Sequence, residues 1–199
     1  MLKIKVSTKD IDRGMQRTMR RIMDKAKYVD IGIQSDEDEK LLIIAGANEF
    51  GATINHPGGT PYGYKTEGDA KKGKVRFLKK GAGYMVLGET EPHTIEIPER
   101  SYIRSTIDEN EDKYLNDIAK KLAGQIIDGN LDKYTALQLM GQKIEGDIKS
   151  KMISLDSPAN APSTIRKKGS DNPLINKGFL IGAIRYVVIE GKPTVKEKQ

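Results

Sequence analysis

The chain has 199 residues, of which 37% are hydrophobic and 31% charged, and this composition supports one substantial core and excludes an intrinsically disordered polymer. It contains no cysteine, which excludes disulfides and thiolate chemistry, and no apolar run approaches the roughly 18 residues of a membrane helix. We therefore expect a chain that folds as one domain and is made and kept in a cytoplasm, without membrane contact.

The net charge of +6 comes from 34 basic and 28 acidic residues. Such an excess attracts nucleic acid by counterion release, but it is equally ordinary for a solvated or partner-facing surface. The basic residues are dispersed, with small clusters over residues 17–21, 71–80 and 166–168. Nucleic-acid binding is therefore an alternative hypothesis and not the main interpretation.

The first quarter of the chain alternates between strand-like and helix-like patterns. Residues 2–6 and 28–33 have the period-two alternation of half-buried strands, and residues 9–26 carry apolar side chains at three- and four-residue intervals. The strongly apolar run over residues 40–50 predicts a buried helix that ends at Gly51. The chain is thus predicted to begin with a strand, a helix, a second strand and a second helix.

Residues 52–96 differ in character because they are rich in glycine and lysine. The segment 56–63 is interpreted as irregular, whereas residues 74–78 and 84–87 predict the two strands of a hairpin. We expect this stretch to project from the core as an extended insertion that contacts neighbouring subunits.

The second half of the chain predicts two helices in an antiparallel hairpin. Apolar side chains recur at helical spacing over residues 114–126 and again over 137–152, with a break at 128–130. A last strand is predicted over residues 180–189, followed by a flexible charged tail over 191–199.

The segment from Asp156 to Ile175 is polar and rich in proline. Its prolines fix the backbone and bias the preceding residues toward extended conformations, so no continuous helix spans it. A loop of this length in a compact domain is either functional or disordered. The whole pattern predicts a single α+β domain over residues 1–190, in which a mostly antiparallel sheet is covered by helices, with a helical hairpin and long extended arms: the insertion over about 52–96 and a proline-rich arm over 156–175.

Three segments carry a resemblance to a known family. The run Ser157-Pro-Ala-Asn-Ala-Pro-Ser-Thr-Ile-Arg-Lys-Lys-Gly-Ser-Asp-Asn-Pro-Leu-Ile175 resembles the C-terminal signature of tailed-phage virion morphogenesis proteins. Upstream, Ile97-Pro-Glu-Arg-Ser-Tyr-Ile-Arg-Ser105 is similar to that family's Pro-x-Arg-Pro-Phe-(Leu/Ile)-Arg segment, with Ser-Tyr in place of Pro-Phe. Asn48-Glu-Phe-Gly51 is the third match, and together the matches lie in order over most of the chain.

The resemblance implies a structural virion protein of the phage neck, which joins or completes the tail at the head–tail connector. Such proteins form rings around the DNA channel, so the implied partners are further copies in a hexamer or dodecamer, the connector or adaptor, and the tail terminator or tube. DNA passes through such a ring without specific binding. The implied location is the virion, after assembly in the host cytoplasm.

The segments 97–105 and 156–175 are predicted to bind partners, because proline lowers the entropy lost on docking and arginine offers planar, multidentate hydrogen bonding. The predicted partner-binding residues are Arg100, Tyr102, Arg104, Asn160, Arg166, Lys167, Lys168 and Asn172. For Arg100 and Arg104 a second interpretation stays open, in which each only braces the start of its own helix. The predicted contacts to DNA in the channel are Lys71, Lys72, Lys79 and Lys80.

The sequence predicts no enzyme, no metal site and no cofactor. His56 and His93 are the candidates for a metal-dependent hydrolase, but each lies in a turn or at the start of a strand, where a surface histidine is ordinary. The acidic run 36–39 fits the N-terminal side of a helix, and the glycine-rich turns lack the lysine and hydroxyl residue of a phosphate-binding loop. The alternative function is a nucleic-acid-binding accessory protein that uses the lysine-rich hairpin and the basic residues of the arm.

Overall fold

The computed structural model describes residues 27–34 and 36–190, so the predicted strand over 2–6, the predicted helix over 9–26 and the predicted tail lie outside the described residues. The chain divides into two compact units. Unit 1 contains the residues up to Glu49 and those from Arg100 onward, and unit 2 contains Phe50–Glu99. The sequence pattern predicts one domain with a projecting insertion over about 52–96, a range close to that of unit 2.

Unit 1 is built on a two-stranded antiparallel sheet of β1 (Lys27–Ile33) and β7 (Ile184–Glu190). In its register Ile31 lies opposite Tyr186, and Ile33 lies opposite Ile184. The predicted last strand begins later than residue 180, because residues 179–182 form the short helix α8 (Phe179–Gly182) before β7 starts.

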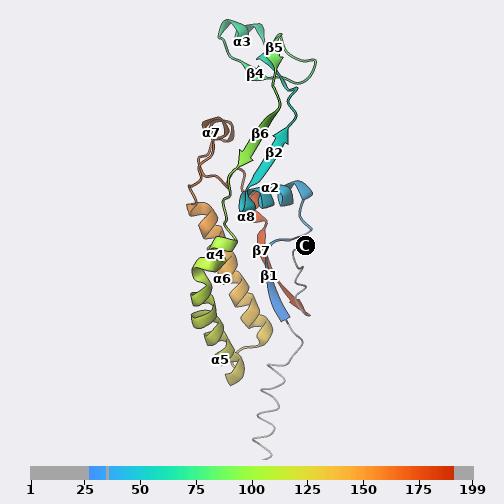
Figure 1. Ribbon diagram of the computed structural model, residues 1–199. Coiled ribbons are helices and arrows are strands. Elements are labelled where there is room, and N and C mark those ends of the chain that lie inside the picture. Colours follow the sequence, from blue (N-terminus) through green and yellow to red (C-terminus); the bar gives the residue numbers. More distant parts are fainter. Residues whose placement is uncertain (1–26, 35, 191–199) are drawn as a thin grey trace, which may run out of the picture. The chain divides into compact units, whose positions relative to one another are not determined.

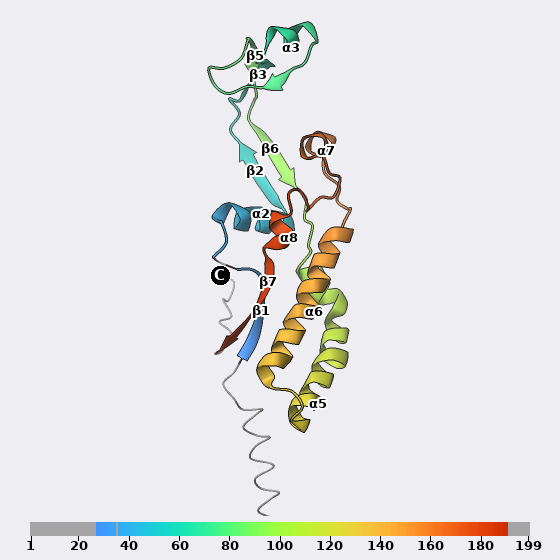
Figure 2. The ribbon, with the colours of Figure 1, turned by 180° about the vertical axis from the view of Figure 1, so that it is seen from behind.

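Two long helical segments complete unit 1. The first runs through α4 (Arg104–Asp112), the π-helical segment η1 (Lys113–Ala119) and α5 (Lys120–Asp128), and the second is α6 (Lys133–Ser154). The first ends at Gly129, whose φ of 79° is left-handed, and the second begins where the Asp132 carboxylate accepts the backbone N–H of Thr135 at 3.0 Å. α6 lies between the β1–β7 sheet and the α4–η1–α5 segment (Figure 1 and Figure 2). The predicted helical hairpin is confirmed.

The hydrophobic core of unit 1 forms where these layers meet. α6 buries Ile144, Ile148 and Met152 along one face, and β7 adds the fully buried Ile184. Gly141 of α6 lets the helix approach the sheet closely, because a Cβ there would lie 2.5 Å from the ring of Tyr186. The buried core cluster consists of Ala45, Tyr102, Tyr114, Ile144, Ile148, Met152, Leu174, Leu180 and Ile184.

Two shorter helices differ from the sequence expectation. α2 (Glu39–Phe50) is the predicted helix, and it ends at Gly51 with a left-handed φ of 73°, but it is not buried. Only Ala45 and Glu49 of α2 are buried, while Ile43 is 64% exposed. The 156–175 arm is also not extended throughout, because α7 (Pro162–Lys168) forms in its middle with proline at the first helical position.

Unit 2 has two small antiparallel sheets. β2 (Ala52–His56) pairs with β6 (His93–Ile97) in a two-stranded ribbon, and the second sheet has the order β4 (Arg76–Phe77), β3 (Pro61–Tyr64), β5 (Met85–Glu89). The helix α3 (Glu67–Lys71) follows β3.

The predicted hairpin of residues 74–78 and 84–87 is therefore wrong. Both segments contain strands, but β3 lies between them and pairs with each, although residues 56–63 were expected to be irregular. Gly63 makes this arrangement possible, because a Cβ at this position would lie 2.1 Å from the carbonyl oxygen of Met85. A central strand that contains proline and glycine carries no period-two apolar signal, which is why the pattern missed it.

The fold class is α+β, as the sequence predicts. Every strand pair among the described residues is antiparallel, but the pairs belong to three small sheets. No helix in the described part of the chain is both long and apolar enough to cross a membrane.

Candidate functional site

The carboxylate of Glu49 closes the N-terminal end of α4 from a distant part of the chain. Its oxygens accept the backbone N–H groups of Tyr102 at 2.8 Å, Ile103 at 3.0 Å and Arg104 at 2.9 Å, and the Ser101 hydroxyl at 2.9 Å. The first N–H groups of a helix have no partner within the helix, and the N-cap residue of α4, Ile103, has a side chain that cannot accept them. Glu49 therefore supplies a cap that is usually provided by the residue just before the helix.

These hydrogen bonds keep Glu49 ionised although only 4% of the residue is exposed. Burial by itself favours the neutral form, but the N–H groups of Arg104, Ile103 and Tyr102 and the Ser101 hydroxyl outweigh it and hold the pKa of Glu49 below its ordinary value. A charged acceptor makes these bonds stronger than those of a neutral cap.

Arg104 braces the start of its own helix. Its Nε donates to the Glu49 carboxylate at 3.3 Å, and its Nη2 donates to the Glu49 backbone carbonyl at 2.8 Å. That carbonyl belongs to the last turn of α2, so Arg104 also provides a hydrogen-bond donor for a carbonyl that has no partner within its helix. The guanidinium is half-exposed, which still allows a partner to contact its outer side.

Arg100 fastens the beginning of the 156–175 arm. Its Nε donates to the carbonyl of Pro158 at 2.7 Å, and its Nη2 donates to the carbonyl of Ala159 at 3.3 Å and to the Asn160 side-chain oxygen at 3.4 Å. The backbone N–H of Arg100 also donates to the carbonyl of Asn48 at 2.7 Å. Arg100 is only 6% exposed, and burial lowers its pKa. Its predicted role as a direct partner contact is therefore not compatible with the structure, because its donors are used within the chain.

The prediction that Tyr102 contacts a partner is also not compatible with the structure. The residue is fully buried and belongs to the core cluster of unit 1, so its ring anchors the segment to the chain's own core and not to a partner. Burial, reinforced by the negative charge of Glu49, raises the pKa of the Tyr102 hydroxyl.

Asn172 fastens the far end of the 156–175 arm. Its Nδ2 donates to the carbonyls of Met152 at 3.1 Å and Ile153 at 3.0 Å, which are orphan acceptors in the last turn of α6. Its Oδ1 accepts the backbone N–H groups of Leu174 at 2.9 Å and Ile175 at 2.8 Å. One amide thus binds the C-terminal carbonyls of α6 and shapes the turn at the end of the arm.

The three basic residues of α7 divide into one internal and two outward side chains. Lys168 donates to the carbonyls of Asn172 and Pro173, and burial together with the charge of Arg100 lowers its pKa. Arg166 and Lys167 are exposed, and the described residues supply no ion pair for either of them. The arm is therefore fixed at both ends and presents charged side chains from its middle.

The structure brings four of the eight predicted partner-binding residues, Arg100, Tyr102, Arg104 and Asn160, together at one place. We call this place the junction cluster, and its residues are Asn48, Glu49, Arg100, Ser101, Tyr102, Ile103, Arg104, Pro158, Ala159 and Asn160. Lys71, Lys72, Lys79 and Lys80 are not part of it, because they lie in unit 2, where all four are exposed.

Glu49 is the residue of the junction cluster that sequence reasoning missed. A signal was present, because an acidic residue in the last turn of a helix opposes the helix dipole and needs another stabilising contact. Two residues of the acidic run 36–39 lie at the start of α2 as predicted: Asp38 Oδ1 accepts the N–H of Lys40 at 2.9 Å, and Glu39 lies in the first turn. The other two, Asp36 and Glu37, pair with Arg185 of β7 instead.

His56 and His93 lie side by side on the β2–β6 ribbon. They are opposite each other in the register, and their rings stack with centroids 4.9 Å apart. His56 Nδ1 accepts the N–H of Gly58 at 3.0 Å, and His93 Nδ1 donates to the carbonyl of Glu91 at 2.8 Å. Within the described residues, no group of three or more histidine, cysteine, aspartate or glutamate side chains is arranged to hold a metal ion.

Comparison of the chain with protein-family models, with curated proteins and with solved structures finds no match. The sequence resemblance and the geometry above are therefore the basis for a functional proposal.

Proposed function

We propose that this chain is a structural, non-catalytic protein of a tailed-phage virion, which assembles as a ring at the neck and joins or completes the tail around the DNA channel. Its partners are further copies of itself, the connector or adaptor, and the tail terminator or tube. The chain needs no cofactor for this role.

The proposal rests on one observation: the three segments that resemble the phage family contact one another in the structure. They are far apart in the sequence, yet Glu49 binds the backbone N–H groups of residues 102–104, and Arg100 binds the carbonyls of residues 158–159. These hydrogen bonds join the three segments into one structural unit. This agreement supports the interpretation of the three short matches as parts of one family pattern.

The 156–175 arm supplies the surface for a neighbouring virion protein. Arg100 fixes one end and Asn172 fixes the other, so that α7 is held in place while Arg166 and Lys167 face solvent. A preorganised segment loses little conformational entropy on docking, and its cations suit an acidic partner surface.

The test is negative-stain imaging with mass determination by light scattering, for the purified chain alone and mixed with the products of the adjacent genes. We expect rings with a mass near six or twelve times 22.1 kDa, or rings that form only with a neighbour. The variant Arg166→Glu/Lys167→Glu should lose binding to that neighbour. The matched control Lys120→Glu/Lys121→Glu makes the same kind of charge change on α5 and should bind normally. A strict monomer that ignores its neighbours would overturn the proposal.

The exposure of Lys71, Lys72, Lys79 and Lys80 supports a second candidate, a nucleic-acid-binding accessory protein. This function requires the chain to retard duplex DNA at low salt, with affinity that falls steeply as salt rises. Replacing the four lysines by glutamate should then abolish the retardation. This alternative would be rejected if the chain forms rings in the absence of DNA and shows no salt-dependent binding to DNA.

A further inference from the structure

Residues 61–88 of unit 2 expose more large hydrophobic side chains than they bury. We call residues 61–88 the tip, and Leu78 is the large hydrophobic side chain that the tip buries. Phe77 is 75% exposed, and the edge strand β5 begins with the exposed residues Met85 and Val86. The other large exposed hydrophobic residues of the tip are Val75, Tyr84 and Leu87. An apolar edge strand with one side unpaired is a surface that associates with other chains.

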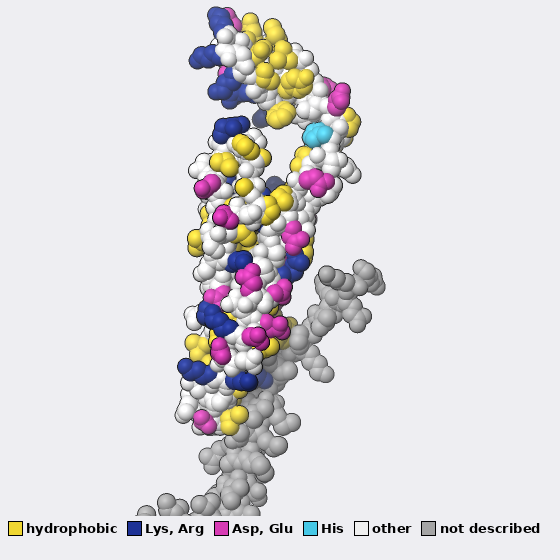
Figure 3. Space-filling view, turned by 60° about the vertical axis from the view of Figure 1, so that its left-hand side comes forward, with side chains coloured by type: hydrophobic (Ala, Val, Ile, Leu, Met, Phe, Trp, Pro, Cys, Tyr) yellow, Lys and Arg dark blue, Asp and Glu magenta, His cyan; other side chains and the backbone are white. Residues whose placement is uncertain are grey.

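The tip is also strongly basic. Its two acidic residues, Glu67 and Asp69, already pair with Lys71 at 2.9 Å and with Arg76 at 3.6 Å. No acidic group among the described residues pairs with its other basic side chains, which are Lys65, Lys72, Lys74, Lys79 and Lys80. Figure 3 shows dark blue side chains beside a yellow apolar patch on this part of unit 2. The tip therefore needs a partner surface that is both apolar and acidic.

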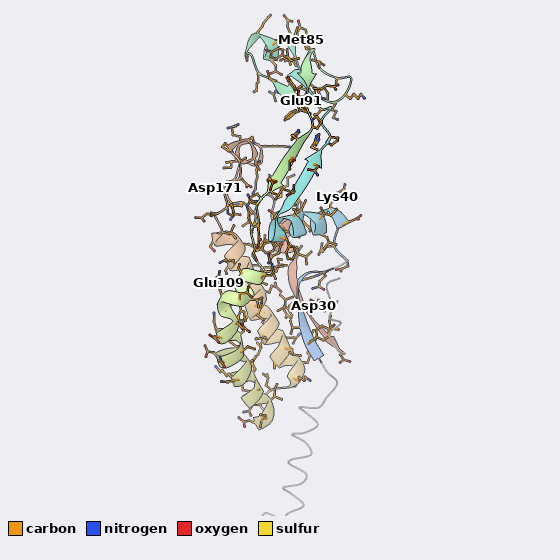
Figure 4. The ribbon with its side chains drawn as sticks, viewed as in Figure 1. Asp30, Lys40, Met85, Glu91, Glu109 and Asp171 are labelled. Atoms are coloured by element: carbon orange, nitrogen blue, oxygen red, sulfur yellow. The ribbon has the colours of Figure 1, made fainter. Side chains whose placement is uncertain are left out.

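The remainder of unit 2 has the opposite charge. We call residues 52–60 and 89–99 the ribbon, which contains β2 and β6, has no lysine or arginine and carries the acidic residues Glu89, Glu91, Glu96 and Glu99. Ile54 and Ile95 lie opposite each other in its register, and both are exposed. Figure 4 shows Met85 on the tip and Glu91 on the ribbon of the same unit. The ribbon is thus an apolar and acidic surface.

We infer that the tip of one copy docks on the ribbon of the next copy. A two-stranded ribbon is marginal by itself and gains stability when another layer covers it. Nucleic acid would bind the lysines of the tip, but it would repel the acidic ribbon and would not cover the exposed aliphatic side chains of β5. An anionic lipid surface would attract the tip but would repel the acidic ribbon beside it. A second copy matches both the charge and the apolar character of each surface.

Because tip and ribbon are different surfaces, the contact is head-to-tail. Such a contact repeats from copy to copy and forms a closed ring or an open filament. The choice of a second copy rests on the proposed ring function, and it deepens that function by naming the surface that joins the copies.

The test uses three full-length charge variants. The tip-reversed variant Lys79→Glu/Lys80→Glu reverses two side-chain charges and lowers the net charge of the tip from +5 to +1. The ribbon-reversed variant Glu91→Lys/Glu96→Lys raises the net charge of the ribbon from −4 to 0, and a third variant carries all four changes. In sedimentation velocity over a concentration series, the tip-reversed and ribbon-reversed variants should each self-associate at least about tenfold more weakly than the unchanged chain. An equimolar mixture of these two should associate again, because the unchanged tip of one copy meets the unchanged ribbon of the other. The four-fold variant should stay weakly associated, because neither of its surfaces keeps its charge.

All four positions are exposed, so the variants should keep the unfolding temperature of the unchanged chain. The control Lys120→Glu/Lys121→Glu should leave self-association unchanged. A chain that stays monomeric at every concentration, or one whose association ignores both reversals, would overturn the inference. Tip reversal that abolishes binding to duplex DNA or to anionic vesicles, with no effect on self-association, would also overturn it. If both charge-reversed variants still form rings with the products of the adjacent genes, the tip-to-ribbon contact is wrong but the proposed neck function is not contradicted.

Discussion

Glu49 holds together segments that are more than 50 residues apart in the chain. Its single carboxylate receives donors from Ser101, Tyr102, Ile103 and Arg104. Removing an ionised acceptor from a buried site leaves its donors without partners, which costs more than the bonds contributed. The residue therefore has a structural importance that its position at the end of an exposed helix does not suggest.

Replacing Glu49 by glutamine tests this importance. Glu49→Gln keeps the size of the side chain but removes its charge and turns one acceptor into a donor that faces backbone N–H groups. We expect the free energy of unfolding to fall by about 3 kcal/mol, measured by chemical denaturation. Glu39→Gln at the exposed start of the same helix should cost no more than about 1 kcal/mol. Equal losses in the two variants would contradict the proposed cap.

The lowered pKa of Glu49 also predicts how stability depends on pH. Above its ordinary value of 4.5 the carboxylate is ionised in both the folded and the unfolded chain, so its stabilisation is fully present. As pH falls below 4.5 and through the lower folded-state pKa, that stabilisation is lost. The difference in unfolding free energy between the unchanged chain and Glu49→Gln should therefore shrink from pH 6 to pH 3. A difference that stays constant would contradict the lowered pKa.

Asn172 makes an equally local prediction for the arm. Asn172→Ala removes the donors to the α6 carbonyls and the acceptor for Leu174 and Ile175. We expect a loss of about 2 kcal/mol in unfolding free energy and faster proteolytic cleavage within residues 156–171. Asn176→Ala removes the same kind of side chain from an exposed position of the same segment and should change neither measurement.

Among the helices and strands, the close contact between α6 and β7 organises unit 1. Gly141 faces the ring of Tyr186, whereas Gly146, further along α6, has no atom within 4 Å of the place where its Cβ would lie. Glycine is unfavourable inside a helix, so intrinsic propensity alone favours alanine at both positions. Packing against the strand reverses this preference at Gly141 only.

The pair Gly141→Ala and Gly146→Ala should therefore change stability in opposite directions. Gly141→Ala should lower the free energy of unfolding by about 1–3 kcal/mol, because the new methyl group overlaps the Tyr186 ring. Gly146→Ala should raise it by about 0.5–1 kcal/mol through helix propensity. Thermal or chemical denaturation distinguishes the two, and stabilisation by both substitutions would contradict the packing of α6 on β7.

The two units are unequal in what stabilises them. The buried core cluster consists entirely of residues from unit 1, whereas unit 2 exposes most of its large hydrophobic side chains. The chain leaves and re-enters unit 1 at adjacent points, because the N–H of Arg100 donates to the carbonyl of Asn48 at 2.7 Å. Unit 1 thus has its own core, and the two points where the chain leaves and re-enters it are adjacent.

Replacing residues 51–98 by a Gly-Ser-Gly linker should consequently leave unit 1 folded. A short connection is sufficient because Asn48 and Arg100, which lie next to the two ends that it joins, are hydrogen-bonded to each other. We expect a cooperative unfolding transition and a helical circular-dichroism spectrum, together with loss of the tip-to-ribbon self-association. A shortened chain without cooperative unfolding would show that unit 1 needs unit 2 for its stability.

Local sequence patterns were sufficient for α2, for the two long helical segments and for the two strands of unit 1, but not for the short helices α3, α7 and α8. The apolar repeats over 114–126 and 137–152, Gly51, and the break at 128–130 all predicted elements or boundaries that the structure has. These features depend on interactions between residues at most a few positions apart, such as helix caps and helical faces. A sequence displays such interactions directly.

Only the folded chain decided the roles of the residues in the junction cluster and the order of strands in unit 2. Arg100 and Tyr102 have the composition of a binding surface, but contacts with Pro158 and with the core make them internal. Likewise, β3 enters between β4 and β5 because Gly63 allows close approach of two backbones. Each outcome depends on a contact between residues many positions apart, whose free energy exists only once the intervening chain has folded.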